Sequence, residues 1–279
     1  MLLHSINWPP FNSTDSVSAT RPQIESALPG LEGSWSMPVH STQPDEPVLE
    51  LTVHFVAFES RLSVLGNGKT LAGSSCPTQI GFSASCRKAE FSSGRQAARC
   101  ALTQLSPALA SVLVPIGGDR EPLWPQGVVG SITHVSGLAG AAVGLSNSWR
   151  YLGIDLEQTA GGKAQSALRA FVLDSAELSL LQRRCEAIGQ LNLDTHVTHV
   201  FSAKECLYKA AFPSVRRFFG FSEARLCEYE FLSADRGPEV RLALEITDGL
   251  GGEFVAGSRW WVEVWRIKTP YTYLSVLAC

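Results

Sequence analysis

The order of strand-like and helix-like segments along this chain constrains its fold more than any other feature. Runs of β-branched and apolar residues predict strands, and apolar residues at helical spacing predict helices. The predicted strands are Val48–Phe58, Gly127–Thr133, Leu138–Leu145, Tyr151–Leu156, Ala224–Phe231, Val240–Thr247, Trp260–Ile267 and Tyr271–Ala278. The predicted helices are Ser85–Gln104, Asp174–Gly189 and a third from about Thr195 to Ala211. This order favours an α+β architecture.

Single residues mark several of the expected boundaries. Asp174 is suited to cap the start of the second helix, and Gly189 to follow its end. Pro213 cannot continue a helix interior, so we expect the third helix to stop before it. His134 follows a strand-like run and is expected in a tight turn that joins two paired strands.

Composition restricts the class of protein. Hydrophobic residues make up 45% of the 279 residues and charged residues 18%, as in globular proteins. The net charge of −3 argues against a nucleic-acid binder that relies on a basic surface. The seven cysteines are scattered without a C-x-x-C pair, so we expect mostly free thiols and a reducing compartment.

Neither a signal peptide nor a membrane span is expected. The N-terminus lacks a basic region followed by a sustained apolar run, and no run of about 18 apolar residues occurs. We therefore expect a cytoplasmic protein. Residues 1–46 are rich in Ser, Pro and Thr and are expected to form a loose leader.

Two carboxylates at the end of a predicted strand suggest a metal site. Asp155 and Glu157 are two residues apart, so a strand places both side chains on one face. Two adjacent like charges are costly unless a cation lies between them, and Mg²⁺ prefers such oxygen ligands. A solvated strand edge with ordinary acids is the alternative.

A third acid lies on the predicted helix from Thr195 to Ala211. Glu205 and Lys209 are four residues apart and share a helix face. Their neighbours are largely apolar, so this pair is expected to be partly buried rather than a simple surface ion pair. Lys204 points elsewhere, either as a second phosphate contact or as a solvated residue.

Several cations could bind phosphate. Arg87 and Arg95 lie eight residues apart, about two helical turns, and could clamp a phosphate from one face. On these two residues alone, a solvated basic face is the better explanation. His134 and Arg120 are ambiguous, since a lone histidine or a loop arginine is often structural.

Four motifs in order resemble the 4′-phosphopantetheinyl transferases of the monomeric Sfp type, in particular the branch of enterobactin synthetase component D. They lie within Arg87–Ala98, Ile116–His134, Gly153–Glu157 and Phe201–Lys209. Cys206 replaces the usual Ser or Ala, and Thr133 occupies a position where Ser is common. Neither departure is expected to bear directly on the chemistry.

The resemblance implies a role for each matching residue. Asp155, Glu157 and Glu205 would hold Mg²⁺, or Mn²⁺, against the pyrophosphate of coenzyme A. Glu205 would also help to deprotonate the acceptor serine, directly or through water. Lys209 would stabilise charge on the pyrophosphate and the leaving group, so that Asp155, Glu205 and Lys209 form the catalytic set.

Contacts to coenzyme A follow from the same resemblance. Arg87, Arg95 and His134 would contact its phosphates, including the 3′-phosphate. Arg120 and Lys204 are weaker candidates for this role.

The fold implied is two similar α/β halves packed as a monomeric pseudo-dimer, with the active site in the cleft between them. Residues 47–150 would grip the coenzyme A phosphates, and residues 151–279 would bind the metal and carry out catalysis.

The implied reaction moves the 4′-phosphopantetheine group of coenzyme A to a serine of an apo acyl, peptidyl or aryl carrier protein. The products are holo carrier and 3′,5′-ADP, as for a holo acyl-carrier-protein synthase, and the pathway would be siderophore or other nonribosomal peptide, polyketide or fatty acid synthesis. No nucleic acid partner is expected. The alternatives are another metal-dependent enzyme that transfers or hydrolyses phosphate, and an inactive module that binds coenzyme A or a carrier protein.

Overall fold

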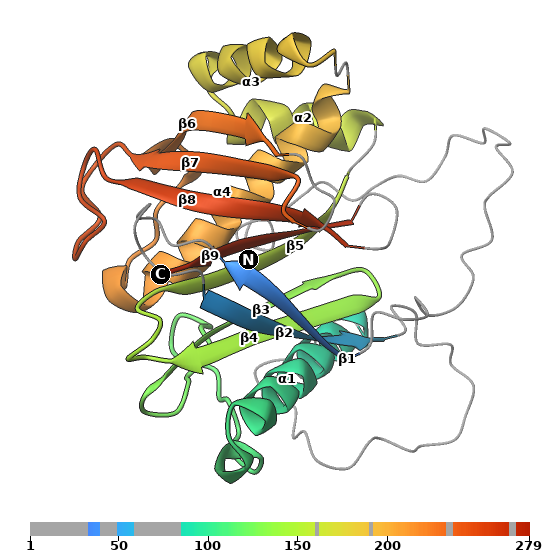
Figure 1. Ribbon diagram of the computed structural model, residues 1–279, viewed down its shortest axis with the longest axis vertical. Helices are drawn as coiled ribbons and strands as arrows, with labels where there is room; N and C mark the ends of the chain where they lie inside the picture. The colour runs from blue at the N-terminus through green and yellow to red at the C-terminus, as the bar shows by residue number, and fades with distance from the viewer. Residues whose placement is uncertain are drawn as a thin grey trace, which may run out of the picture.

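Two antiparallel sheets with helices on their outer faces make up the described part of the chain (Figure 1). The computed structural model describes residues 33–39, 49–58, 85–159, 162–189, 192–232, 237–267 and 272–279. The first sheet contains β1 (Gly33–Val39), β2 (Leu49–Ala57), β3 (Val128–Val135) and β4 (Leu138–Leu145). The second contains β5 (Leu152–Gln158), β6 (Ala224–Phe231), β7 (Val240–Ile246), β8 (Arg259–Arg266) and β9 (Thr272–Ala278).

Helix α1 (Ser85–Leu105) covers the outer face of the first sheet, whose strand order is β1-β2-β4-β3. Ala97, Ala98 and Leu102 of this helix are fully buried in one apolar cluster with residues of β4. Small side chains let the helix lie close to the sheet. At Gly94 the approach is so close that an added Cβ would lie 2.9 Å from Cγ2 of Ile132 in β3.

Helix α4 (Leu193–Val215) covers the outer face of the second sheet, whose strand order is β5-β9-β8-β7-β6. The helices α2 (Gly162–Val172) and α3 (Ser175–Ala187) pack beside it and toward β6 (Figure 1). Strand β5 pairs antiparallel with β9, with Asp155 opposite Ser275. This strand order makes β5 and β6 the edges of the second sheet.

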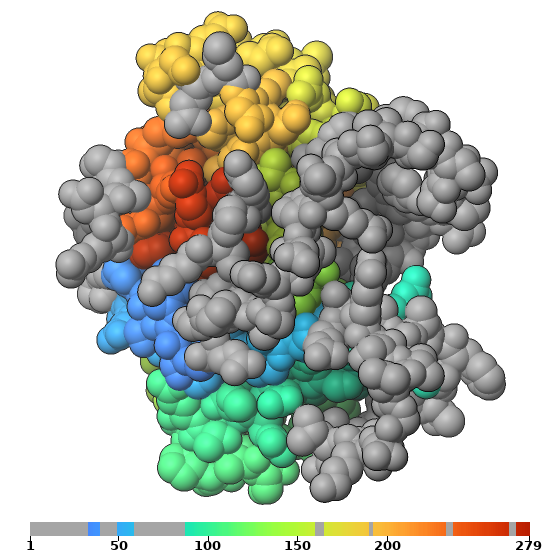
Figure 2. Space-filling model, turned by 90° about the vertical axis from the view of Figure 1, so that its right-hand side faces the viewer, coloured from blue at the N-terminus to red at the C-terminus, as the bar shows by residue number. Residues whose placement is uncertain are grey.

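The two sheets face each other across a shared apolar layer. Leu51, Val53 and Phe55 of β2 belong to the same buried cluster as Ile154 and Leu156 of β5. Figure 2 shows the blue residues of β1 and β2 directly against the orange and red residues of the second sheet. The described chain is therefore layered as helix, sheet, sheet, helix.

The edge strands β3 and β5 meet through side-chain hydroxyls. Ser131 Oγ accepts a hydrogen bond from the backbone N–H of Ile154 at 3.0 Å, and Thr133 Oγ1 accepts one from Leu156 N–H at 2.8 Å. All four residues are buried. Buried backbone donors must be paired, so these hydroxyls replace the ladder partner that an edge strand lacks.

The predicted strands and helices are all present, with ends shifted by a few residues. The α+β architecture is confirmed as two antiparallel sheets with helices. Asp174 caps α3 and accepts a hydrogen bond from Glu177 N–H, and Gly189 follows the helix with a φ of +69°. The cysteines for which the structure describes a side chain carry free thiols, as expected (Cys100, Cys185, Cys206, Cys227 and Cys279).

Four local expectations are corrected. His134 lies inside β3, and the turn to β4 falls at residues 136–137. Helix α4 runs through Pro213 and ends at Val215, because a proline in the final turn removes only one helical hydrogen bond. Helix α2 was not expected. Strand β1 lies inside the predicted leader, whose other residues lie outside the described part of the chain.

None of the described helices combines the length and the apolar content that a membrane span requires.

Two buried histidines fix the start of α4 to the second sheet. Nδ1 of His196 and Nδ1 of His199 lie 2.9 Å and 2.8 Å from the hydroxyl of Tyr229 in β6. The hydroxyl can donate to one ring and accept from the other. Burial lowers the pKa of His196 to about 4 and that of His199 well below its usual value, so both rings are neutral.

We expect both rings to remain neutral in the native protein at pH 5. Unfolded histidine titrates near pH 6.5, so the unfolded state binds more protons as the pH falls. For His196, stability therefore falls by roughly 1.4 kcal/mol per pH unit between about pH 6.5 and 4, and His199 acts in the same direction. Histidine ¹³Cε1 NMR checks this, with the resonances assigned by His196→Gln and His199→Gln. A native titration near pH 6.5 for either ring contradicts it. In urea unfolding, His196→Gln should lose less stability than the parent between pH 7 and 5.

Candidate active site

Helix α4 rests directly on strand β5 because residue 153 has no side chain. A Cβ added to Gly153 would lie 2.1 Å from the carbonyl oxygen of Cys206 and 3.0 Å from Cβ of Ala210. The nearer atom is helix backbone, which cannot turn aside as a flexible side chain can. Asp155 and Glu157 share the face of β5 with Gly153, so the glycine determines how closely α4 approaches the two acids.

Asp155 is a buried carboxylate, 4% exposed, held by groups from two other elements. Lys209 Nζ lies 2.5 Å from Oδ1, and Ser202 Oγ donates to Oδ2 at 2.9 Å, both from α4. Thr133 Oγ1 of β3 lies 3.4 Å from Oδ1. A buried charge needs this degree of pairing, because the loss of hydration costs several kcal/mol.

Glu157 and Glu205 complete a carboxylate cluster, which we define as Asp155, Glu157, Glu205 and Lys209. Burial raises the pKa of Glu157 well above its usual value, and the charges of Asp155 and Glu205 raise it further. Burial also raises the pKa of Glu205, with Asp155 adding to it. Burial lowers the pKa of Lys209, but the carboxylates of Asp155 and Glu205 outweigh it, so the ammonium stays charged.

The chemistry of the carboxylate cluster fits a hard divalent cation. The charges of Asp155 and Glu205 both act on Glu157, and a bound dication neutralises carboxylates that lie this close together. Among the described residues, no three Asp, Glu, His or Cys side chains already form a group that could hold a metal ion. Lys209 and Ser202 occupy the oxygens of Asp155 instead. Asp155, Glu157 and Glu205 thus lie near enough for two of them to raise the pKa of the third, but they do not form a finished coordination group.

Arg95 is a half-buried cation on α1 that does not use all of its N–H donors. Its Nε and Nη1 are buried and have no hydrogen-bond partner among the described residues. The guanidinium lies 5.0 Å from the ring centre of Phe91, and burial lowers its pKa to about 10. A guanidinium with unused donors is suited to a phosphate. Its role toward coenzyme A stays a prediction.

Strand β3 connects this cation to the carboxylate cluster. Its residues alternate in direction: Ser131 and Thr133 face β5, whereas Ile132 packs with α1. The half-buried His134 shares the side of Ile132 and therefore faces the layer that carries Arg95. The predicted contact Arg87 is exposed near the start of the same helix.

Arg120 lies in a loop that is tied to the end of α4. It is exposed and has a left-handed φ of 68°. Its neighbour Glu121 forms an ion pair with Arg216 at 2.8 Å. Burial raises the pKa of Tyr208, and the charges of Glu205 and Asp119 add to it, so this loop lies near the helical turn that carries Glu205. The contact of Arg120 with coenzyme A stays a prediction.

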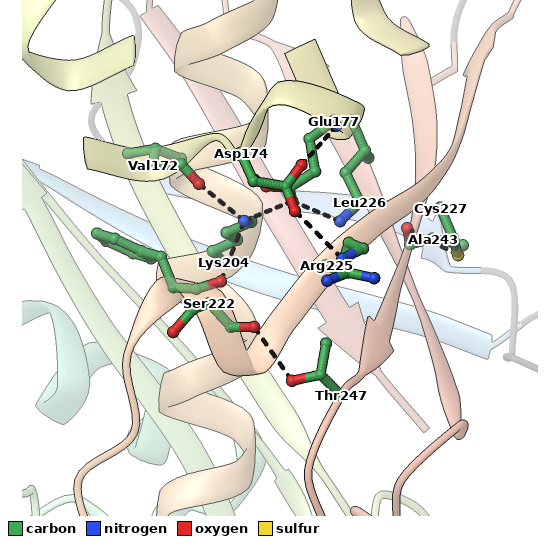
Figure 3. A network of polar contacts seen from close by, with 11 residues as sticks. Val172, Asp174, Glu177, Lys204, Ser222, Arg225, Leu226, Cys227, Ala243 and Thr247 are labelled. Carbon is green, nitrogen blue, oxygen red and sulfur yellow. Dashed lines mark hydrogen bonds and ion pairs between the residues drawn. The ribbon is translucent and has the colours of Figure 1, made fainter. Parts of the chain in front are cut away.

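Lys204 belongs to a network of polar contacts with Val172 and Glu177 (Figure 3). Its Nζ donates to Glu177 Oε1 at 2.6 Å, to the carbonyl of Val172 at 2.8 Å and to that of Phe221 at 3.1 Å. The side chain is 1% exposed. All three protons of the ammonium are therefore used inside the protein. The predicted contact with coenzyme A stays a prediction that none of these bonds supports.

The partner of Lys204 ties several elements to α4. Oε1 of Glu177 also accepts a hydrogen bond from Leu226 N–H of β6 at 2.6 Å, and Oε2 accepts one from Asp174 N–H at 2.8 Å. Figure 3 shows these bonds converging on one carboxylate. The Lys204–Glu177 pair thereby fixes α2, α3 and β6 to the helix that carries Glu205.

Sequence reasoning missed three groups that build the site. Ser202 lies seven residues before Lys209 and so shares its helix face, a signal that was present in the sequence. The hydroxyl of Thr133 and the missing side chain of Gly153 act through contacts between distant segments, which no local pattern reveals. The expectation that Thr133 does not bear on the chemistry is corrected by its contact with Asp155.

Lys204→Met should destabilise the fold by about 3–5 kcal/mol, because it leaves Glu177 as an unpaired buried charge. Adding Glu177→Gln to this variant should restore part of the loss. Urea unfolding measures both. If Lys204 instead contacts coenzyme A, the single variant will bind coenzyme A more weakly at unchanged stability, which would contradict the structural role.

Gly153→Ala should push α4 away from β5, at a cost of about 1–3 kcal/mol for overpacking. Thermal unfolding measures this loss. Gly118→Ala is the matched control, since an added Cβ there meets nothing within 4 Å. Equal melting temperatures for the two variants would show that the contact at Gly153 does not limit the approach of the helix.

Two family models match the chain on either side of the loop between β4 and β5. The model described as the 4′-phosphopantetheinyl transferase N-terminal domain matches residues 79–144. The model described as the 4′-phosphopantetheinyl transferase superfamily matches residues 151–246. The second match contains all four members of the carboxylate cluster.

Curated relatives support the same family. The 4′-phosphopantetheinyl transferase Npt of Nocardia iowensis is 38% identical over 194 residues, covering 67% of this chain and 82% of the relative. PptT of Mycobacterium tuberculosis is 38% identical over 148 residues, covering 53% of this chain and 61% of the relative. Enterobactin synthase component D of Salmonella typhi is 34% identical over 140 residues, covering 50% of this chain and 54% of the relative. The chain thus matches less than two thirds of the last two relatives. Because the match with Npt spans most of that protein, the chain belongs to the 4′-phosphopantetheinyl transferase superfamily.

Proposed function

We propose that this protein transfers the 4′-phosphopantetheine group of coenzyme A to a serine of an apo carrier protein. One observation supports this most: in a member of the superfamily, the buried Asp155 and Glu205 lie near the half-buried Glu157 and Lys209, between β5 and α4. Relatives include proteins named enterobactin synthase component D. We therefore expect a carrier of siderophore or related nonribosomal peptide or polyketide synthesis.

The three carboxylates would hold Mg²⁺, which supplies charge neutralisation at the pyrophosphate worth several kcal/mol. In the reaction, the serine oxygen bonds to the phosphorus that carries pantetheine, and the bond from that phosphorus to 3′,5′-ADP breaks. Lys209 keeps its proton and stabilises the negative charge on the leaving phosphate. Burial raises the pKa of Glu205, which suits its carboxylate to take the serine proton, directly or through water.

The other half of the substrate would lie along the first sheet. Arg95 offers its unused guanidinium donors to a coenzyme A phosphate, and Arg87, His134 and Arg120 are further candidates. We propose that the two sheets with their helices correspond to the two similar halves of a monomeric pseudo-dimer and that coenzyme A binds in a cleft between them. Free described cysteines and a soluble substrate are consistent with action in the cytoplasm.

Mass spectrometry of apo carrier proteins tests the transfer. A panel of carriers is incubated with this protein, coenzyme A and Mg²⁺, and the expected result is a mass gain of one phosphopantetheine group on at least one carrier. EDTA should prevent the gain and added Mg²⁺ or Mn²⁺ should restore it. No gain on any carrier would overturn the proposal.

Asp155→Asn should lower the transfer rate by roughly 10²–10³-fold, since an amide neither pairs with Lys209 nor binds a dication well. Glu230→Gln, at an exposed acid of β6, is the control and should transfer at the parent rate. Circular dichroism checks that both variants fold. Parent rates in folded Asp155→Asn would remove Asp155 from the metal and catalytic sets.

A further inference from the structure

Two hydroxyls of β3 bridge the two sheets in nearly the same way. Ser131 Oγ accepts from Ile154 N–H at 3.0 Å, and Thr133 Oγ1 accepts from Leu156 N–H at 2.8 Å. Each side chain is 3% exposed. As links between β3 and β5, the two residues are therefore equivalent.

The two hydroxyls differ in where their own proton can go. A hydroxyl that accepts an N–H bond on a lone pair still has one proton to donate. Ser131 Oγ lies 3.5 Å from the carbonyl oxygen of Ile154, which is backbone. Thr133 Oγ1 lies 3.4 Å from Oδ1 of Asp155, which is a site carboxylate. Burial removes water as a competing partner, so this acid is the acceptor available to Thr133.

Thr133 contacts Asp155 from β3, which lies along the free edge of β5, and not from α4. Lys209 and Ser202 hold the carboxylate from the helix, whereas Thr133 belongs to the first sheet. The threonine methyl restricts rotation about χ1, so the hydroxyl direction is better fixed than a serine hydroxyl would be. Three contacts from two directions fix both the position and the plane of the carboxylate.

We propose that Thr133 is a positioning residue for Asp155: its hydroxyl orients the carboxylate from the first sheet for binding of the divalent cation. The metal role of Asp155 rests on the proposed function. The same strand carries His134 on its other face, so Thr133 also fixes the carboxylate cluster relative to the layer that holds Arg95.

Three variants separate positioning from simple attachment of the two sheets. Thr133→Val keeps the shape and removes the hydroxyl, Thr133→Ser keeps the hydroxyl, and Ser131→Ala removes the matched bridge without touching Asp155. Thr133→Val and Ser131→Ala each leave one buried N–H without its partner, so both should lower the melting temperature by similar amounts. If Thr133→Val does not fold, Thr133→Ala replaces it.

Manganese binding to the full-length protein without substrate gives the deciding readout, through the free Mn²⁺ signal in electron paramagnetic resonance. Groups that orient a metal ligand typically contribute 10–100-fold to metal affinity, so Thr133→Val should bind Mn²⁺ at least about tenfold more weakly. Ser131→Ala should stay within about twofold of the parent, and Thr133→Ser should recover most of the affinity. In the transfer assay, the half-saturating Mg²⁺ concentration should follow the same order.

Two results would overturn the proposal. One is Mn²⁺ affinity in Thr133→Val equal to that of the parent, and the other is equal weakening in Thr133→Val and Ser131→Ala. If Thr133→Val binds Mn²⁺ as tightly as the parent while the parent transfers normally, the positioning role is refuted and the proposed function stands. Conversely, a parent that transfers nothing, with Mn²⁺ affinity lost only in Thr133→Val, would retain the positioning role and refute the function.

Discussion

The structure is organised around the need to keep one buried negative charge, Asp155, paired. The carboxylate belongs to β5, an edge strand of the second sheet. It is buried among β5, β3 and α4, where water cannot solvate it. Its partners come from β3 and from two turns of α4. The close helix packing at Gly153 and the hydroxyl contacts of β3 both bring these partners within reach. At Asp155, the pairing of the charge therefore depends on how closely the helix and the strands pack.

Two lysines of α4 show how one helix can serve stability and chemistry separately. Lys204 and Lys209 are five residues apart, about 140° around the helix, and thus face different surroundings. Lys204 meets one carboxylate and two carbonyls, and its charge is fully used. Lys209 pairs with Asp155, lies near Glu205 and remains 18% exposed. Of the two lysines, only Lys209 keeps part of its side chain accessible.

The sequence predicted local features well and long-range contacts poorly. Period-two spacing placed Asp155 and Glu157 on one face, and helical spacing separated Lys204 from Lys209, both correctly. Strand β1 was missed because only Met37 and Val39 are buried in it, which leaves a weak alternating pattern. The contacts of the Thr133 hydroxyl could not be predicted, because its partners are 22 and 23 residues away, across a boundary between two sheets.

The pairing of β5 with β9 has a consequence for how the protein is made. Strand β5 carries Asp155 and Glu157, yet its ladder partner begins only at Thr272, after α2, α3, α4 and three further strands. Such distant pairing is slow to form, because a long loop must close before any contact is gained. During synthesis on the ribosome, every acid and lysine of the site has emerged well before the strand that fixes β5. A nascent chain that stops short of β9 therefore contains the complete set of reactive side chains but lacks the strand partner that holds β5 in place.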